Sequence, residues 1–132
     1  MASNYFYGLG RRKSATAQVR LTSGKGEIVI NSKSAGDYFD GSKQLLHGLK
    51  APFLCLELDP DKFNVSVKIN GSGHASQADA ISLGVAKALV ELNPDYRATL
   101  RKAELLGRDT REKERKKFGL RSARKQRQFT KR

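Results

Sequence analysis

Two histidines and one cysteine are the residues of this 132-residue chain best suited to acid–base or nucleophilic chemistry. His47 and His74 could form a general acid–base pair for RNA cleavage, and Cys55 could pair with either histidine as a nucleophile. Each arrangement requires side chains that meet in the fold, and the sequence gives no sign that they do. We therefore favour a structural or solvated role for all three. A metal site needs several converging ligands, and no suitably spaced set occurs, so no metal or cofactor is expected.

A glycine-containing segment, Asn70–Gln77, lies between a predicted strand and a predicted helix. Glycines before a helix N-terminus can cradle a phosphate, because the bare backbone allows close approach. The dinucleotide-binding pattern matches poorly, since its third glycine would fall at Ser76 and no later strand carries a ribose-binding acid. No Walker motif occurs either. We interpret the segment as a tight strand-to-helix turn, which remains compatible with an RNA phosphate contact.

The charge of the chain is its strongest functional signal. Lys and Arg number 26 against 13 Asp and Glu, which gives a net charge of +13 and points to a polyanionic partner, most often a nucleic acid. The charge is uneven: residues 1–106 hold 14 basic and 10 acidic residues (net +4), whereas residues 107–132 hold 12 and 3 (net +9). We predict a globular domain over 1–106 and an extended basic tail over 107–132, which orders only on a partner.

Clustered cations supply the candidate phosphate contacts. Arg11, Arg12 and Lys13 stand together at the mouth of a predicted strand, where a solvated loop and a phosphate contact are about equally favoured. Arg20, on the polar face of that strand, could extend the same surface. In the basic tail no acid follows Phe118. The tail cations assigned to RNA phosphates are Arg111, Arg115, Lys116, Lys117, Arg121, Arg124, Lys125 and Arg127.

Alternation of apolar and polar residues predicts the strands. Residues 14–21 alternate, Ser23 to Gly26 is a turn, and 27–30 returns as a strand, so 14–30 is predicted to be a hairpin. Further strands are expected at 5–9 and 63–70, with an extended segment at 52–58.

Apolar residues at helical spacing follow. Ser76 is predicted to cap a helix that buries Ile81, Val85, Leu89 and Leu92 and ends at Asn93-Pro94. Pro94 is expected to start a second helix with a stripe of Tyr96, Leu100, Ala103 and Leu106, capped by Gly107. Short helices are expected around 34–39 and 42–49. The class is therefore α+β, with one small sheet and helices packed on one face.

The compartment follows from what the sequence lacks. Cys55 is the only cysteine, so no intrachain disulfide forms and a reducing compartment is expected. No run of about 18 apolar residues occurs and the N-terminus is unlike a signal peptide, so no membrane association is expected. We expect a bacterial cytoplasm or its organellar equivalent.

Three segments resemble the family of the universal ninth protein of the small ribosomal subunit, in its bacterial or organellar form. They are Gly10-Arg-Arg-Lys-Ser-Ala-Thr-Ala, Asp109-Thr-Arg-Glu-Lys-Glu-Arg-Lys-Lys-Phe-Gly-Leu and the ending Gln128-Phe-Thr-Lys-Arg. The resemblance covers essentially the whole chain. It departs at Gly71-Ser72-Gly73, where the family usually has three glycines in a row.

The resemblance implies a fold with a left-handed βαβ crossover and a structural role on the ribosome. It implies binding to small-subunit rRNA in the head, with neighbouring small-subunit ribosomal proteins as further partners. It also implies a tail that threads through RNA and meets peptidyl-site tRNA, and the matching residues here are Lys131 and Arg132.

Three other functions are weighed against this one. An RNA-binding subunit of an RNA-based nuclease would carry its cations on the folded face, whereas this chain concentrates them in the tail. An RNA-cleaving enzyme would depend on His47 and His74, and alanine at both would test that hypothesis. A DNA-compacting protein would prefer duplex DNA over RNA in competition.

Overall fold

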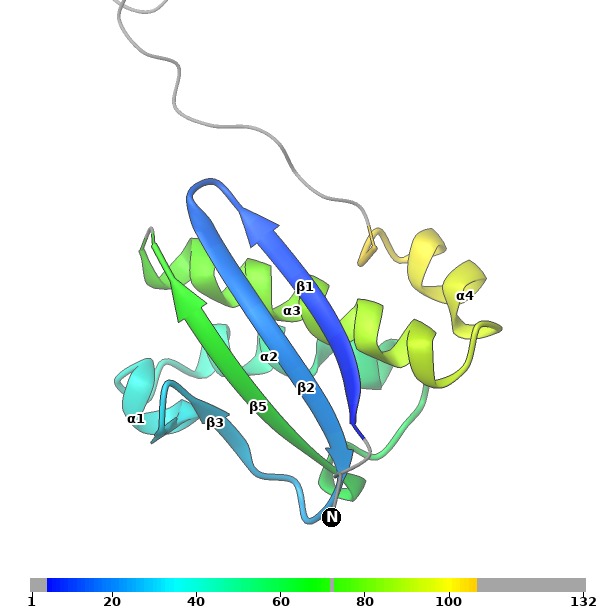
Figure 1. Cartoon of the computed structure of the whole chain (residues 1–132), viewed down its shortest axis with the longest axis horizontal. Coiled ribbons are helices and arrows are strands. Elements are labelled where there is room, and N and C mark those ends of the chain that lie inside the picture. The colour runs from blue at the N-terminus through cyan, green and yellow to red at the C-terminus, as the bar shows by residue number, and fades with distance from the viewer. Residues whose placement is uncertain (1–4, 72, 107–132) are drawn as a thin grey trace, which may run out of the picture.

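The computed structural model describes residues 5–71 and 73–106, which form a five-stranded mixed sheet with helices on one face (Figure 1). The strands are β1 (Phe6–Arg12), β2 (Ala15–Ser23), β3 (Ile28–Ile30), β4 (Lys33–Ser34) and β5 (Phe63–Asn70). The helices are α1 (Ala35–Tyr38), α2 (Lys43–Cys55), α3 (His74–Leu92) and α4 (Tyr96–Lys102), with a 3-10 turn, η1, at Pro60–Lys62. The predicted α+β class is confirmed.

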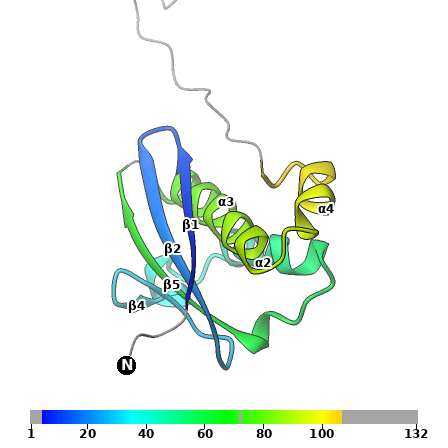
Figure 2. The same ribbon diagram turned by 45° about the vertical axis from the view of Figure 1, so that its right-hand side comes forward.

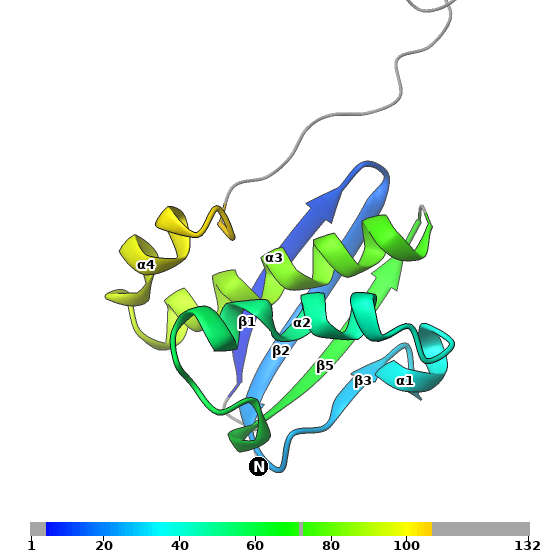
Figure 3. The ribbon, with the colours of Figure 1, turned by 180° about the vertical axis from the view of Figure 1, so that it is seen from behind.

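The sheet has the order β1-β2-β5-β3-β4, and β3 and β5 are its parallel neighbours. In Figure 3 the helices lie in front of the sheet, both strands point upward, and the chain passes from β3 on the right to β5 on the left. A connection that moves leftward with its helices toward the viewer is left-handed, whereas nearly all such connections are right-handed. The crossover therefore has the rare hand that the resemblance implies.

The predicted hairpin over 14–30 is wrong. β2 pairs with β1 on one side and with β5 on the other, so β5 separates β2 from β3. Two interactions explain this. β2 pairs with β5 along the whole length of β5, which the short β3 could not match. Beyond β2, the side-chain Oδ1 of Asn64 accepts the backbone N–H groups of Lys25 and Glu27, at 2.9 and 3.2 Å, and so draws the chain to β5.

The extended segment predicted at 52–58 is also wrong, because α2 continues through Pro52 to Cys55. Proline inside a helix removes one backbone hydrogen bond, but here it lies in the last turns. Leu49 and Phe53, four residues apart, are both 1% exposed, and Phe53 stacks on Phe63 at a centroid distance of 5.5 Å. Their burial holds the helix in place. The short helix predicted around 34–39 is present as α1, with Ser34 as its side-chain cap.

The two C-terminal helices form as predicted, but with different ends. α3 begins at His74 with Gly73 at its N-cap, so Ser76 is a buried residue within the helix and not the cap. Its predicted core residues Ile81, Val85 and Leu89 are buried, and it ends at Asn93 as expected.

The last helix, α4, is shorter than predicted. It begins at Tyr96 after Asp95 and ends at Lys102, where Ala103 is its exposed C-cap residue. Leu100 is fully buried and anchors the helix. The predicted continuation of the helix to Leu106 is therefore wrong, and Gly107 lies outside the described residues.

Helix α3 lies directly on the backbone of β1. A Cβ atom at Gly8 would clash with the carbonyl oxygen of Gly84, and one at Gly10 would clash with that of Ala80. A Cβ at Gly84 would in turn crowd the side chain of Val19. Glycine is required at this crossing because no side chain fits between strand and helix. The Gly8-Leu9-Gly10 sequence thus serves packing.

The helices form a single layer. Figure 2 shows α3 crossing the strands with α2 beside it and α4 beyond its end, while the opposite face of the sheet carries no helix among the described residues. Within residues 5–71 and 73–106, no helix has both the length and the apolar character needed to cross a membrane.

Candidate nucleic-acid interface

The three clustered cations Arg11, Arg12 and Lys13 lie at the tip of the β1–β2 hairpin. Arg12 pairs with Ala15, which leaves Lys13 and Ser14 as a two-residue turn. Lys13 has a φ of 52°, a left-handed conformation that a tight turn requires. The structure therefore brings the three residues together, at the end of a hairpin that projects to one corner of the sheet (Figure 1).

The three side chains do not share one environment. Strand alternation places Arg12 on the helical face with Gly10, and its Nε lies 3.5 Å from Oδ2 of Asp79 on α3. The Arg12 side chain is only 18% exposed. Arg11 and Lys13 are exposed. A phosphate can thus reach Arg11 and Lys13 directly, whereas Arg12 is engaged with the fold.

The turn between β5 and α3, which contains Gly71 and is called the glycine turn below, adjoins this hairpin tip. A Cβ at Gly71, whose φ is 86°, would clash with the carbonyl oxygen of Ser14, so the two loops are in contact. The turn leads into α3, whose N-cap residue Gly73 makes no side-chain capping bond. Free N–H groups at a helix start favour an anion. Hairpin tip and helix start thus lie together, an adjacency that sequence reasoning did not foresee.

Gln77 holds the glycine turn from inside the protein. Its side chain is 7% exposed, its Nε2 donates to the carbonyl oxygen of Gly71 at 3.0 Å, and its Oε1 accepts from the hydroxyl of Tyr38 at 2.8 Å. These bonds tie the turn to α1. The interpretation as a strand-to-helix turn is confirmed, and Ser72 lies outside the described residues.

The residues considered for catalysis do not form a site. His47 is exposed on α2, whereas His74 packs against Tyr38 and Phe39 with ring centroids 5.5 Å apart in each case. The Cys55 thiol donates to the carbonyl oxygen of Thr99, at 3.9 Å. In the described part of the chain, no hydrogen bond joins these three residues and no group of three His, Cys, Asp or Glu side chains could hold a metal ion.

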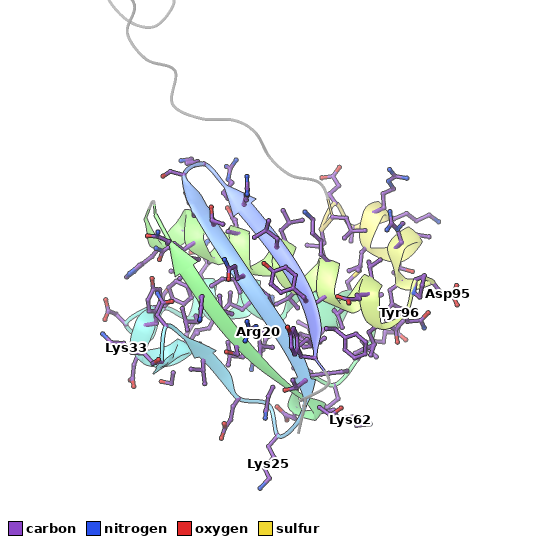
Figure 4. The ribbon with its side chains drawn as sticks, in the orientation of Figure 1. Arg20, Lys25, Lys33, Lys62, Asp95 and Tyr96 are labelled. Atoms are coloured by element: carbon purple, nitrogen blue, oxygen red, sulfur yellow. The ribbon has the colours of Figure 1, made fainter. Side chains whose placement is uncertain are left out.

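A second group of cations was missed by sequence reasoning. Arg97, Arg101 and Lys102 are exposed on α4 and line a shallow groove of about 710 Å³, with Asp95 at its start. Figure 4 shows Asp95 and Tyr96 at the beginning of this helix. The spacing of four between the two arginines is the sequence signal that would have revealed a shared face.

The candidate residues of the basic tail lie outside the described residues. They are Arg111, Arg115, Lys116, Lys117, Arg121, Arg124, Lys125, Arg127, Lys131 and Arg132. Their assignment to rRNA or tRNA stays a prediction.

Comparison with known proteins decides the family. The family model described as ribosomal protein S9/S16 matches residues 10–132. This chain belongs to that family. It is also 48% identical to the small ribosomal subunit protein uS9 of Mycoplasmoides gallisepticum, over 132 residues and the whole length of both chains.

Family membership settles the broad class of function. The chain is a structural constituent of the small ribosomal subunit, a ribonucleoprotein, with rRNA and other ribosomal proteins as its partners. The S9 family is not a family of enzymes, which removes RNA cleavage by His47 and His74 as an explanation.

Proposed function

We propose that this chain binds rRNA in the head of the small subunit and contacts peptidyl-site tRNA through the end of its basic tail. The observation that carries the proposal is the net +9 of residues 107–132, a segment included in the family match. A cation that meets a phosphate releases condensed counterions, so each such contact adds sequence-independent affinity. The site of action is a ribosome in a bacterial cytoplasm or an organelle.

The described residues support a separate rRNA contact at the hairpin tip. Arg11 and Lys13 are exposed beside the start of α3, so a backbone phosphate there would meet two cations and free N–H groups. Arg12 instead faces α3, where its Nε lies 3.5 Å from Oδ2 of Asp79. The folded domain thus offers a local anchor, and the tail cations extend it along the RNA.

The tRNA contact is assigned to Lys131 and Arg132. Two cations at a free chain end can contact a phosphate backbone without reading bases, because phosphates carry no base identity. Part of the interaction is lost to screening and to ordering the chain end. The expected contribution is therefore modest and equal for all tRNAs.

Small subunits reconstituted with a chain lacking residues 130–132 test this contact. We expect normal assembly, because the domain and the other tail cations remain, and a loss of peptidyl-site tRNA affinity within about tenfold. Filter binding of several tRNAs measures it. The matched control is Lys131→Arg with Arg132→Lys, which keeps both charges and should bind as the original chain does.

Two outcomes would contradict the tRNA assignment. Unchanged binding of every tRNA would mean that Lys131 and Arg132 are a solvated end. Failure of the truncated chain to assemble into the subunit would assign these two residues to rRNA binding instead.

A further inference from the structure

Among the described residues no helix covers the face of the sheet opposite α2 and α3, and this uncovered face carries aromatic and cationic side chains. Strand register aligns them in rows: Tyr7 lies opposite Arg20, and Gln18 lies between Leu9 and Lys68. The next row toward the hairpin tip contains Arg11. Tyr7 is 40% exposed, and Arg20 and Lys68 are exposed. Figure 4 shows Arg20 projecting from the middle of this face.

Tyr5 completes the surface at the start of β1. It is 45% exposed, and the guanidinium carbon of Arg20 lies 5.0 Å from the centre of its ring. The two residues line a shallow groove of about 370 Å³ that runs over β5 to Val29, with Glu27 at its edge. A cation beside an aromatic ring holds both side chains in place. A flat ring is thus presented next to a positive charge.

The composition of this face favours RNA over a protein partner. Protein interfaces are built around an apolar centre depleted of charge, whereas this centre holds Arg20 flanked by Gln18 and Ser66. Exposed aromatic rings on a sheet, combined with cations, suit unpaired nucleotides, whose bases stack while their phosphates meet the charges. Duplex RNA hides its bases and could use the cations only.

We propose that the uncovered face of the sheet binds an unpaired segment of RNA, with Tyr5 and Tyr7 stacking on bases and Arg11, Arg20 and Lys68 contacting phosphates. This rests on the proposed function, since rRNA is the RNA that the chain meets. It adds a surface on the folded domain that adjoins the hairpin tip at Arg11, and one that distinguishes unpaired from duplex RNA.

The full chain is tested with an unstructured oligouridine, a duplex RNA of equal length and a transcript of the rRNA head domain. Tyr5→Leu with Tyr7→Leu should weaken binding to oligouridine about tenfold or more and leave duplex binding unchanged. Tyr5→Phe with Tyr7→Phe keeps both rings and should bind as the original chain does. All four substitutions are at exposed positions, and circular dichroism confirms that the variants fold.

The cations are tested by salt dependence. Arg20→Gln with Lys68→Gln should reduce the slope of log affinity against log salt for oligouridine by about 1.4, at roughly 0.7 for each single-strand phosphate contact. Lys43→Gln with Lys50→Gln removes the same charge from α2, on the other side of the sheet, and should not change the slope.

Each alternative result has a distinct meaning. If the variant with Tyr5→Leu and Tyr7→Leu (the leucine variant) and the original chain bind oligouridine equally, the assignment of this face is overturned. Binding of the head-domain transcript by both would still leave the proposed function standing. Loss of a neighbouring protein from subunits reconstituted with the leucine variant, with RNA binding intact, would assign the face to a protein and contradict the proposal. Failure of the original chain to bind the head-domain transcript would contradict the proposed function itself.

Discussion

The Nε atom of Arg12 lies 3.5 Å from Oδ2 of Asp79, and this ion pair joins the tip of β1 to the second turn of α3. The three consecutive cations at the hairpin tip therefore have two different roles. Arg12 faces the helix, while Arg11 on the opposite face of the strand and Lys13 in the turn stay exposed to a partner.

Substitutions at the hairpin tip should therefore weaken RNA binding to different extents, depending on which of the three cations is replaced. Arg11→Gln with Lys13→Gln should reduce the slope of log affinity against log salt for the rRNA head domain by about 1.4–1.8, at roughly 0.7–0.9 for each phosphate contact. Arg12→Gln should change the slope less than Arg11→Gln alone or Lys13→Gln alone, because the guanidinium of Arg12 already faces Asp79. Lys43→Gln with Lys50→Gln is the control of equal charge. A slope that falls most with Arg12→Gln would contradict this division.

The ion pair itself should contribute little to stability. Asp79 is 65% exposed, and exposed ion pairs are typically worth less than about 1 kcal/mol. Asp79→Ala should accordingly change the free energy of unfolding by less than about 1 kcal/mol in a urea titration. A larger loss would mean that Asp79 organises the hairpin.

The crossing of β1 and α3 should tolerate no side chain. Gly10→Ala places a methyl group against the carbonyl oxygen of Ala80, and we expect the free energy of unfolding to fall by about 3 kcal/mol or more. Gly48→Ala is the matched control on α2, where an added Cβ meets nothing within 4 Å. Since alanine favours helix, Gly48→Ala should raise stability by roughly 0.5–1 kcal/mol. Equal effects of the two substitutions on thermal unfolding would refute the close approach.

The buried amide of Gln77 should couple α1 to the glycine turn. Tyr38→Phe removes one hydrogen bond and should cost about 1 kcal/mol, whereas Gln77→Leu leaves both the Tyr38 hydroxyl and the Gly71 carbonyl without this partner and should cost about 2–3 kcal/mol. A double-mutant cycle measured by chemical denaturation should give a coupling of about 1 kcal/mol. A coupling near zero would show that the bond between the two side chains contributes nothing.

The local pattern of apolar and polar residues was enough to predict those strands and helices whose buried and exposed faces differ clearly. β2 and β5 alternate buried and exposed residues as their sequences do. α3 buries Ile81, Val85 and Leu89 of its predicted stripe, while Leu92 at its end is partly buried. The charge division and the three family motifs likewise led from the residues to a ribosomal protein, which the family match confirms.

Interactions between residues far apart in the sequence could not be predicted from the local pattern. The partner of β3 depends on Asn64, which lies more than thirty residues away and captures the chain after β2 through its side chain. The different roles of Arg11 and Arg12 depend on Asp79, which no spacing rule connects to the hairpin. The segment from Pro52 was predicted to be extended, but it continues α2 to Cys55, because the burial of Phe53 outweighs the hydrogen bond that proline removes.

The central claim is that the basic tail carries much of the RNA binding, and the salt dependence of that binding tests it most directly. A chain ending at residue 117 lacks six cations, Arg121, Arg124, Lys125, Arg127, Lys131 and Arg132, and no acids. Its affinity for the rRNA head domain, measured from low to high salt, should show a slope shallower than that of the full chain by several units, at roughly 0.7–0.9 for each phosphate that the shortened chain no longer neutralises. An unchanged slope would place RNA binding on the folded domain and contradict this claim.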